Sequence, residues 1–157
     1  MIKRAALGMR AHLDNFGLHS FPKLTGGKGV HVVVPLLPHL KWDEAKAFTK
    51  GVAEAFERVD PANFVATMSK SKRKGRIFID YLRNARSATA LAAWSPPGRP
   101  GAPIAVPVTW EFFSGLKSLP VYSMTHPEEA ARHFSAWKNF DTCRVKLTKA
   151  MLKQAGI

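Results

Sequence analysis

The amino-acid sequence predicts an α+β fold, with a mostly antiparallel sheet and flanking helices. A strand–loop–strand unit follows the first helical pattern, and later helical patterns lead directly into strand patterns. The length of 157 residues, 46% of them hydrophobic, suffices for one domain with its own core. We therefore expect a single domain over residues 1–157.

The first elements follow from apolar spacing and chain-breaking residues. Apolar side chains recur at helical spacing over residues 2–16, and Gly17 indicates the end of that helix. Residues 18–23 fit a short strand, which Pro22 would restrict to a sheet edge. Residues 30–34 are a β-branched run and give the strongest strand pattern in the chain.

The middle of the chain alternates between helix and strand patterns. Asp43 is the expected N-cap of a helix that ends before Asp60 and Pro61. Strands are then predicted over three ranges: 64–68, 77–82 and, more weakly, 88–93.

The last third of the chain is harder to assign. Residues 95–107 are rich in Pro and Gly and predict an ordered loop. Thr109 is the expected cap of a short helix that runs through Leu116. Two further helical patterns span about 127–137 and 141–155.

The charge balance separates this chain from an ordinary globular protein. It has 24 Lys and Arg against 11 Asp and Glu, a net charge of +13, which favours polyanionic partners such as DNA over the alternative of a generally basic protein.

The lone Cys143 excludes a disulfide framework and predicts a reducing, cytoplasmic setting, where we expect association with the nucleoid. No apolar run approaches 18 residues, so no membrane span is expected.

Residues 25–29, the glycine-rich segment, lie between the first two predicted strands. Glycines permit close backbone approach, and successive amide groups can bind an anion, with Lys28 adding charge. The spacing is not that of a Walker P-loop. A strand connection without function is the alternative. The candidate nucleotide-binding residues here are Thr25, Gly26, Gly27 and Lys28.

Asp80 and His31 are candidates because of strand alternation. In a strand over residues 77–82, Asp80 and Phe78 would share the face opposite the isoleucines. His31 would likewise leave the valine face of its own strand. If both strands belong to one sheet, the two side chains could share its polar face. The alternative for each is a hydrogen-bonded structural residue.

Residues 70–76, the basic segment, contain five cations. Clusters of this kind supply phosphate contacts that carry no sequence information. A solvated loop is the alternative. The candidate nucleic-acid-binding residues are Lys70, Lys72, Arg73, Lys74 and Arg76.

Two of these stretches resemble motifs of a known family. The run K-L-T-G-G-K-G-V-H-V-V-V-P-L, residues 23–36, resembles the second motif of the polymerase domain of bacterial ligase D, in the archaeo-eukaryotic primase superfamily. Residues 66–84, from A-T-M-S-K to R-I-F-I-D-Y-L-R-N, resemble its third motif. The resemblance covers residues 5–120 and leaves 121–157 as a divergent helical tail.

The resemblance implies a role in DNA repair by non-homologous end joining, through Mn²⁺- or Mg²⁺-dependent nucleotidyl transfer to a DNA primer end. DNA and a nucleoside triphosphate are the partners it implies. By position, Asp80 would be a catalytic, metal-binding carboxylate, and His31 would be catalytic and lie with Lys28 in the nucleotide site. Thr25 replaces a serine that contacts phosphates, and Arg73 matches a basic residue near the primer end.

The chain also departs from the family pattern. It contains no Asp-x-Asp pair, and Pro97 stands where relatives often carry an arginine, with Arg99 shifted nearby. The chain thus resembles the second half of that domain, and we expect it to be impaired or inactive alone. A non-catalytic basic DNA-binding module and a structural remnant are the alternatives. An uncovered sheet edge would favour a homo-oligomer or a partner chain.

Overall fold

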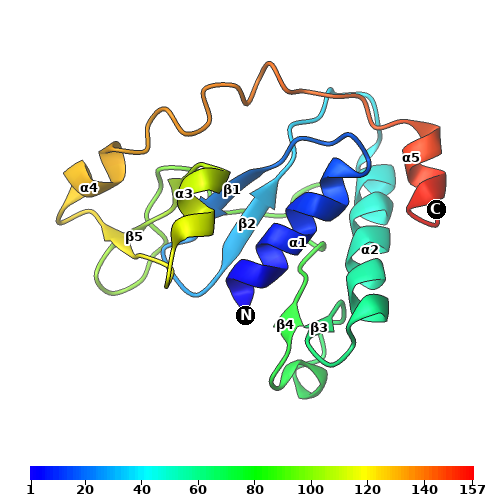
Figure 1. Ribbon diagram of the computed structural model, residues 1–157, viewed down its shortest axis with the longest axis horizontal. Helices are drawn as coiled ribbons and strands as arrows, with labels where there is room; N and C mark the ends of the chain where they lie inside the picture. Colours follow the sequence, from blue (N-terminus) through cyan, green and yellow to red (C-terminus); the bar gives the residue numbers. More distant parts are fainter. The chain divides into compact units, whose positions relative to one another are not determined.

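The computed structural model describes residues 1–157, which fold into two compact units (Figure 1). The first unit contains Met1–Leu36 and Leu91–Val145, and the second contains Leu37–Ala90 and Lys146–Ile157. Helices, one three-stranded antiparallel sheet and two two-stranded pairs make up the fold, one pair antiparallel and the other parallel. The predicted mixture of helices with mostly antiparallel strands is therefore confirmed.

The first unit is organised around a sheet of order β2-β1-β6. Strand β1 (Phe21–Leu24) pairs antiparallel with β2 (Val30–Val33) and with β6 (Val106–Pro107). Helix α1 (Ile2–Asp14) contacts β2, and Gly17 follows it with a positive φ of 70°, as expected of a residue that ends a helix.

Pro22 does not lie at a sheet edge, because β1 is the central strand of the three. Hydrogen bonds between antiparallel strands alternate along the ladder. The bond from Thr25 N to Gly29 O places the Pro22–Val32 pair at a position without such bonds. On the side of β1 that faces β6, Pro22 forms a hydrogen bond through its carbonyl alone, which accepts from Val108 N. The sequence prediction was wrong because a central strand can tolerate proline where no amide proton is needed.

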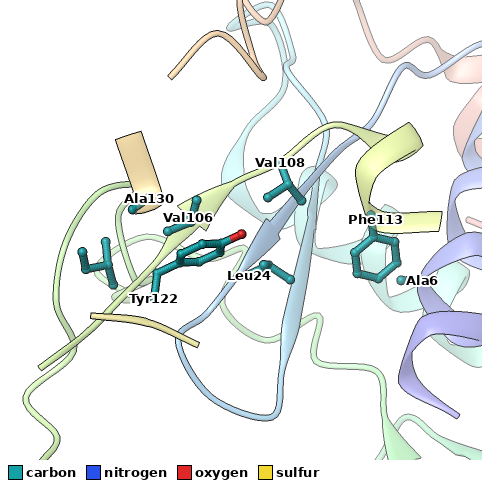
Figure 2. Close-up of a cluster of buried hydrophobic side chains, with 8 residues drawn as sticks. Ala6, Leu24, Val106, Val108, Phe113, Tyr122 and Ala130 are labelled. Carbon is teal, nitrogen blue, oxygen red and sulfur yellow. The ribbon is translucent and has the colours of Figure 1, made fainter. Parts of the chain in front are cut away.

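The core of the first unit draws on distant parts of the chain (Figure 2). Figure 2 shows Leu24 of β1 among side chains from β6, α1 and the segment near Tyr122. The buried members are Ala6, Leu24, Ile104, Val106, Val108, Phe113, Tyr122 and Ala130. Apolar residues of β1 and β2 on the same face, such as Val32, pack against this cluster, so the opposite face of the hairpin carries its polar side chains.

Residues 95–107 are not a plain loop. They contain β6 and also β5 (Pro103–Ile104), which pairs antiparallel with β7 (Tyr122–Ser123). Both short strands are buried, and they owe their extended form to partners far away in the sequence. Helix α3 (Trp110–Gly115) begins where predicted, since Thr109 Oγ1 accepts a bond from Phe112 N at 3.1 Å.

The second unit contains α2 (Trp42–Val59) beside the parallel pair of β3 (Phe64–Val65) and β4 (Ile77–Phe78). The N-cap of α2 is Lys41, not Asp43, and the Lys41 amide donates to the Glu44 carboxylate at 2.9 Å. Asp43 lies in the first turn, where a negative charge favours the helix dipole. A short 3-10 helix, η1 (Ser71–Arg73), separates the two strands.

The helical and strand patterns late in the chain are shorter than predicted. Helix α4 (Pro127–Ala131) and helix α5 (Lys149–Gln154) replace the longer expected helices, and residues 88–93 form no strand. The apolar residues of the predicted helices are spaced as a helix requires, but most residues between α4 and α5 form turns. None of the helices combines the length and the apolar character needed to cross a bilayer.

Candidate functional site

The glycine-rich segment forms the turn between β1 and β2 (Figure 1). Thr25 closes it, because its backbone N and its Oγ1 both donate to the Gly29 carbonyl, at 3.3 and 2.9 Å. Gly26 has a φ of 69°, and a Cβ there would lie 2.9 Å from Pro103 Cβ. The turn therefore needs glycine at position 26, both for its backbone conformation and for its close packing.

Arg99 lies against this segment. A Cβ built on Gly27 would stand only 2.7 Å from the Arg99 Nη1, so the guanidinium fills the space that the glycine leaves. Lys28 and Arg99 are both exposed. The segment thus presents two cations beside a tight backbone turn, an arrangement suited to an anion. In the sequence, Arg99 is shifted from the position at which relatives often carry an arginine. The fold nevertheless brings the Arg99 side chain to the glycine-rich segment.

His31 lies on the face of the hairpin opposite the core. Its directly opposed partner on β1 is Lys23, which is only 6% exposed and donates its ammonium to the Leu91 carbonyl. Sequence reasoning did not select Lys23. The signal that could have found it was the register, because alternation along β1 places Lys23 on the same face as His31.

Asp80 is not a strand residue. Strand β4 ends at Phe78, and β4 pairs with β3, whereas β2 belongs to the β2-β1-β6 sheet. His31 and Asp80 could share a polar face only if both strands belonged to one sheet, and this condition is not met. The Asp80 carboxylate instead accepts a bond from Leu82 N at 3.0 Å and lies 3.8 Å from Arg83 Nε. It is exposed and organises the turn that follows the strand.

The acidic residues of the structure do not fit a metal centre of the two-ion kind. No group of three or more His, Cys, Asp and Glu side chains is placed to hold a metal ion. In the second unit, the Asp60 carboxylate accepts bonds from the Asn63 side chain and Glu57 accepts one from Ala66 N. Asp80 has the Arg83 guanidinium beside it and belongs to no such group.

The basic segment divides into projecting and anchored cations. Lys70, Lys72 and Lys74 are exposed. Arg73 lies 3.7 Å over the Phe78 ring and donates to the Thr67 carbonyl at 3.3 Å. Arg76 donates to the Pro61 carbonyl at 3.2 Å. Arg73 therefore ties the segment to β4, Arg76 ties it to the chain before β3, and the three lysines remain exposed.

The fold thus combines a small antiparallel sheet with a glycine-rich turn beside two exposed cations, an arrangement that suits an anionic group. The sequence model of the family described as "LigD, primase-polymerase domain" matches residues 1–137. The chain belongs to this family of primase-polymerase domains. The match extends into residues 121–137, the first part of the segment that was expected to diverge.

Characterised relatives agree with the family. The chain is 35% identical over 147 residues to the multifunctional non-homologous end joining protein LigD of Pseudomonas aeruginosa, covering 92% of this chain and 18% of the relative. It is 32% identical over 111 residues to the bifunctional non-homologous end joining protein LigD of Bacillus subtilis, covering 70% and 18%. The chain thus spans less than a fifth of the length of these relatives.

A solved structure of the same family has a similar fold. The polymerase domain of Mycobacterium tuberculosis ligase D in complex with DNA superimposes with a TM-score of 0.81 at 31% identity. The alignment covers 89% of this chain and 49% of that domain. The fold of this chain is therefore that of about half of a ligase D polymerase domain.

Proposed function

We propose that this chain is a DNA-repair protein of the end-joining type that binds DNA and a nucleoside triphosphate. The observation that carries the proposal is the glycine-rich segment, on which Lys28 and Arg99 flank a tight turn. We further propose that the two units act together as one domain, in the cytoplasm and near the nucleoid. The ligase D polymerase domain in complex with DNA supports DNA as a partner.

Nucleotidyl transfer by this chain alone is proposed to be impaired or absent. The chain has no Asp-x-Asp pair, and Asp80 lies beside Arg83 and belongs to no group of three or more side chains that could hold a metal ion. Two-ion transfer requires acidic ligands that hold both ions, whether Mn²⁺ or Mg²⁺. The alternative, a basic DNA-binding module without catalysis, is favoured by the same observation about Asp80.

A primer-extension assay separates an active polymerase from a binding module. A primer–template with ribonucleoside triphosphates is incubated with the chain and Mn²⁺ or Mg²⁺, and we expect no templated extension. Extension by the wild-type chain that Asp80→Ala abolishes would show that the chain is an active polymerase.

DNA binding is tested through its salt dependence. We expect replacement of Lys70, Lys72 and Lys74 by Gln to flatten the plot of log affinity against log salt by about 0.9 for each phosphate that the protein no longer neutralises. Fluorescence anisotropy of a labelled duplex with a 3′ overhang measures it. The matched control replaces Lys117, Lys138 and Lys153, which are also exposed, and should keep the slope. Equal slopes in all three proteins would place the DNA contacts outside the basic segment.

Self-association or a partner chain is proposed from the apolar side chains that the first unit exposes. Phe134 is 70% exposed and Val121 is 59% exposed, so a contact with another chain would bury apolar surface at these side chains. Light scattering over micromolar concentrations measures the mass of the chain in solution. A monomer at every concentration would remove the homo-oligomer from this proposal.

A further inference from the structure

Lys23 is a buried cation outside the groups assigned to the proposed site. Its side chain leaves the central strand β1 and is 6% exposed. Its ammonium donates to the Leu91 carbonyl, and burial lowers the pKa of this ammonium below its usual value. A lysine ammonium carries three donors, so a single carbonyl accepts only one of them.

The charge of Lys23 has no counter-charge in the folded chain. Lys23 takes part in none of the ion pairs formed by Arg10, Lys50, Arg83, His126 and Arg144, and burial alone accounts for its lowered pKa. Burying a charge away from water is unfavourable unless an opposite charge accompanies it. A hydrogen bond to a neutral carbonyl offsets only part of that cost. A cation kept in this state is therefore suited to a ligand that supplies the missing negative charge.

The register of the hairpin places Lys23 at the base of the glycine-rich segment. Lys23 is directly opposite His31, and Thr25 follows two residues later, where β1 enters the turn. Residues two apart in a strand project from the same face. The face that carries His31 thus holds a buried cation next to the turn. The turn itself carries exposed Lys28, and the Arg99 guanidinium lies against it.

We propose that Lys23 is a binding residue for the polyphosphate group of the nucleotide, whose negative charge compensates its buried ammonium. This inference rests on the proposed function, since it takes the glycine-rich segment as the triphosphate site. Lys23 acts through its charge and its free donors, in addition to tethering Leu91. Because it does not touch the reacting atoms in this scheme, it is a binding residue and not a catalytic one.

The test uses the whole chain and inorganic tripolyphosphate without metal, titrated by calorimetry. Lys23→Met removes the charged group but keeps the unbranched apolar stem of the side chain, and Lys28→Met probes the exposed cation of the same site. The matched control is Lys3→Met in α1, because Lys3 also donates its ammonium to a backbone carbonyl, that of Leu116, at 2.7 Å. We expect Lys23→Met to weaken tripolyphosphate binding by roughly tenfold, the order of one charge-assisted hydrogen bond, and Lys3→Met to leave it unchanged.

The outcomes separate this inference from the proposed function. If the wild-type chain binds tripolyphosphate and Lys28→Met weakens it, but Lys23→Met binds as the wild type does, Lys23 is only a tether and the inference fails alone. If the wild-type chain does not bind tripolyphosphate, the triphosphate site itself is wrong, and both fail. Weakening by Lys23→Met and Lys28→Met, with normal Lys3→Met, supports both.

A measurement on the wild-type chain covers the case in which Lys23→Met does not fold. Lysine side-chain ¹⁵N resonances are recorded with and without tripolyphosphate, and Lys23→Arg assigns the Lys23 signal by its absence. We expect the ammonium resonance of Lys23 to shift on binding and that of Lys3 to stay in place. A Lys23 resonance that does not respond while Lys28 does overturns the inference.

Discussion

Gly27 leaves the space that the Arg99 guanidinium occupies. A Cβ at this position would lie 2.7 Å from Arg99 Nη1, closer than such atoms approach one another. Because Nη1 ends a flexible side chain, Gly27→Ala should displace the guanidinium and leave the backbone in place. We expect tripolyphosphate affinity to fall by about tenfold, as when one charged hydrogen bond is removed, with little change in melting temperature.

The matched control for this substitution is Gly115→Ala, at the end of α3. A Cβ at Gly115 meets nothing within 4 Å, so affinity should stay at the wild-type value and stability should be equal or slightly higher. Calorimetry and thermal melts of both variants make the comparison. If Gly27→Ala binds tripolyphosphate as tightly as Gly115→Ala does, Arg99 takes no part in binding.

His133 makes the stability of the first unit depend on pH. Its Nε2 lies 2.8 Å from the Tyr122 hydroxyl, and its pKa is lowered, first by burial and then by the nearby Arg132 charge. The unfolded chain therefore protonates His133 more readily than the folded chain does. The contribution of neutral His133 to the free energy of unfolding is fully present above about pH 6.5 and is lost as the pH falls. We expect the wild-type melting temperature to drop between about pH 7 and pH 5, and to drop less in His133→Asn.

A double variant sharpens this comparison. Burial also lowers the pKa of His12, so the slope of melting temperature against pH should be smallest in a variant that replaces both His12 and His133. A wild-type slope in His133→Asn would mean that its proton is not linked to folding.

Thr109 stabilises α3 through its cap. Its Oγ1 accepts a bond from Phe112 N, one of the amides that the first turn of a helix leaves unpaired. We expect Thr109→Ala to lower the free energy of unfolding by about 1 kcal/mol, measured by urea denaturation. Thr109→Ser retains an oxygen acceptor and should stay within a few tenths of the wild type. Equal destabilisation of the two variants would point to the packing of the methyl group in place of the cap.

Elements with strong local patterns were predicted well, and those that depend on distant partners were not. The β-branched run became β2, and Thr109 caps α3, because both are set by residues within a few positions. Pro22 was assigned to an edge because the sequence cannot reveal its neighbours in the sheet. The chain that follows β6 donates one hydrogen bond, from Val108 N, to the Pro22 carbonyl. The strands β5 and β6 form within a Pro- and Gly-rich stretch through pairing with remote segments.

The candidate site shows the same division. The turn at Thr25 and its glycines were predicted from their own residue types, and Gly26 has the backbone conformation that glycine permits. Asp80 was placed by alternation along a strand over residues 77–82, but β4 ends at Phe78 because its partner β3 is only two residues long. The burial of Lys23 could not be predicted, since it depends on where the chain near Leu91 passes.

At the scale of the whole molecule, composition predicted the kind of partner, and the family predicted the fold. The charge of +13 indicated polyanions without locating the cations. The structure separates cations that serve folding, such as Arg73 on Phe78, from cations that extend outward, such as Lys72. Charge counting cannot make this distinction, because it depends on which aromatic rings and carbonyls lie within reach.

The stability of the first unit depends on one core built from residues far apart in the chain. Phe113 of α3 is fully buried and belongs to a cluster that reaches from Ala6 in α1 to Ala130 in α4 (Figure 2). Truncation of a buried phenylalanine costs about 3–5 kcal/mol, a large part of the roughly 5–15 kcal/mol that stabilises a domain. We therefore expect Phe113→Ala to lower the melting temperature by roughly 15 °C or more, as followed by circular dichroism.

The control for Phe113→Ala is Phe134→Ala, which deletes the same atoms from a side chain that is 70% exposed. Phe134 touches only the edge of the core, through a ring contact with Trp94 at 4.6 Å, so its truncation should cost less than about 1 kcal/mol. Since α1, β1, β6 and α3 share the cluster around Phe113, their helical and tertiary signals should disappear in one transition. Similar melting temperatures for the two variants, or separate transitions for helical and tertiary signals, would show that this cluster is not the common core of the unit.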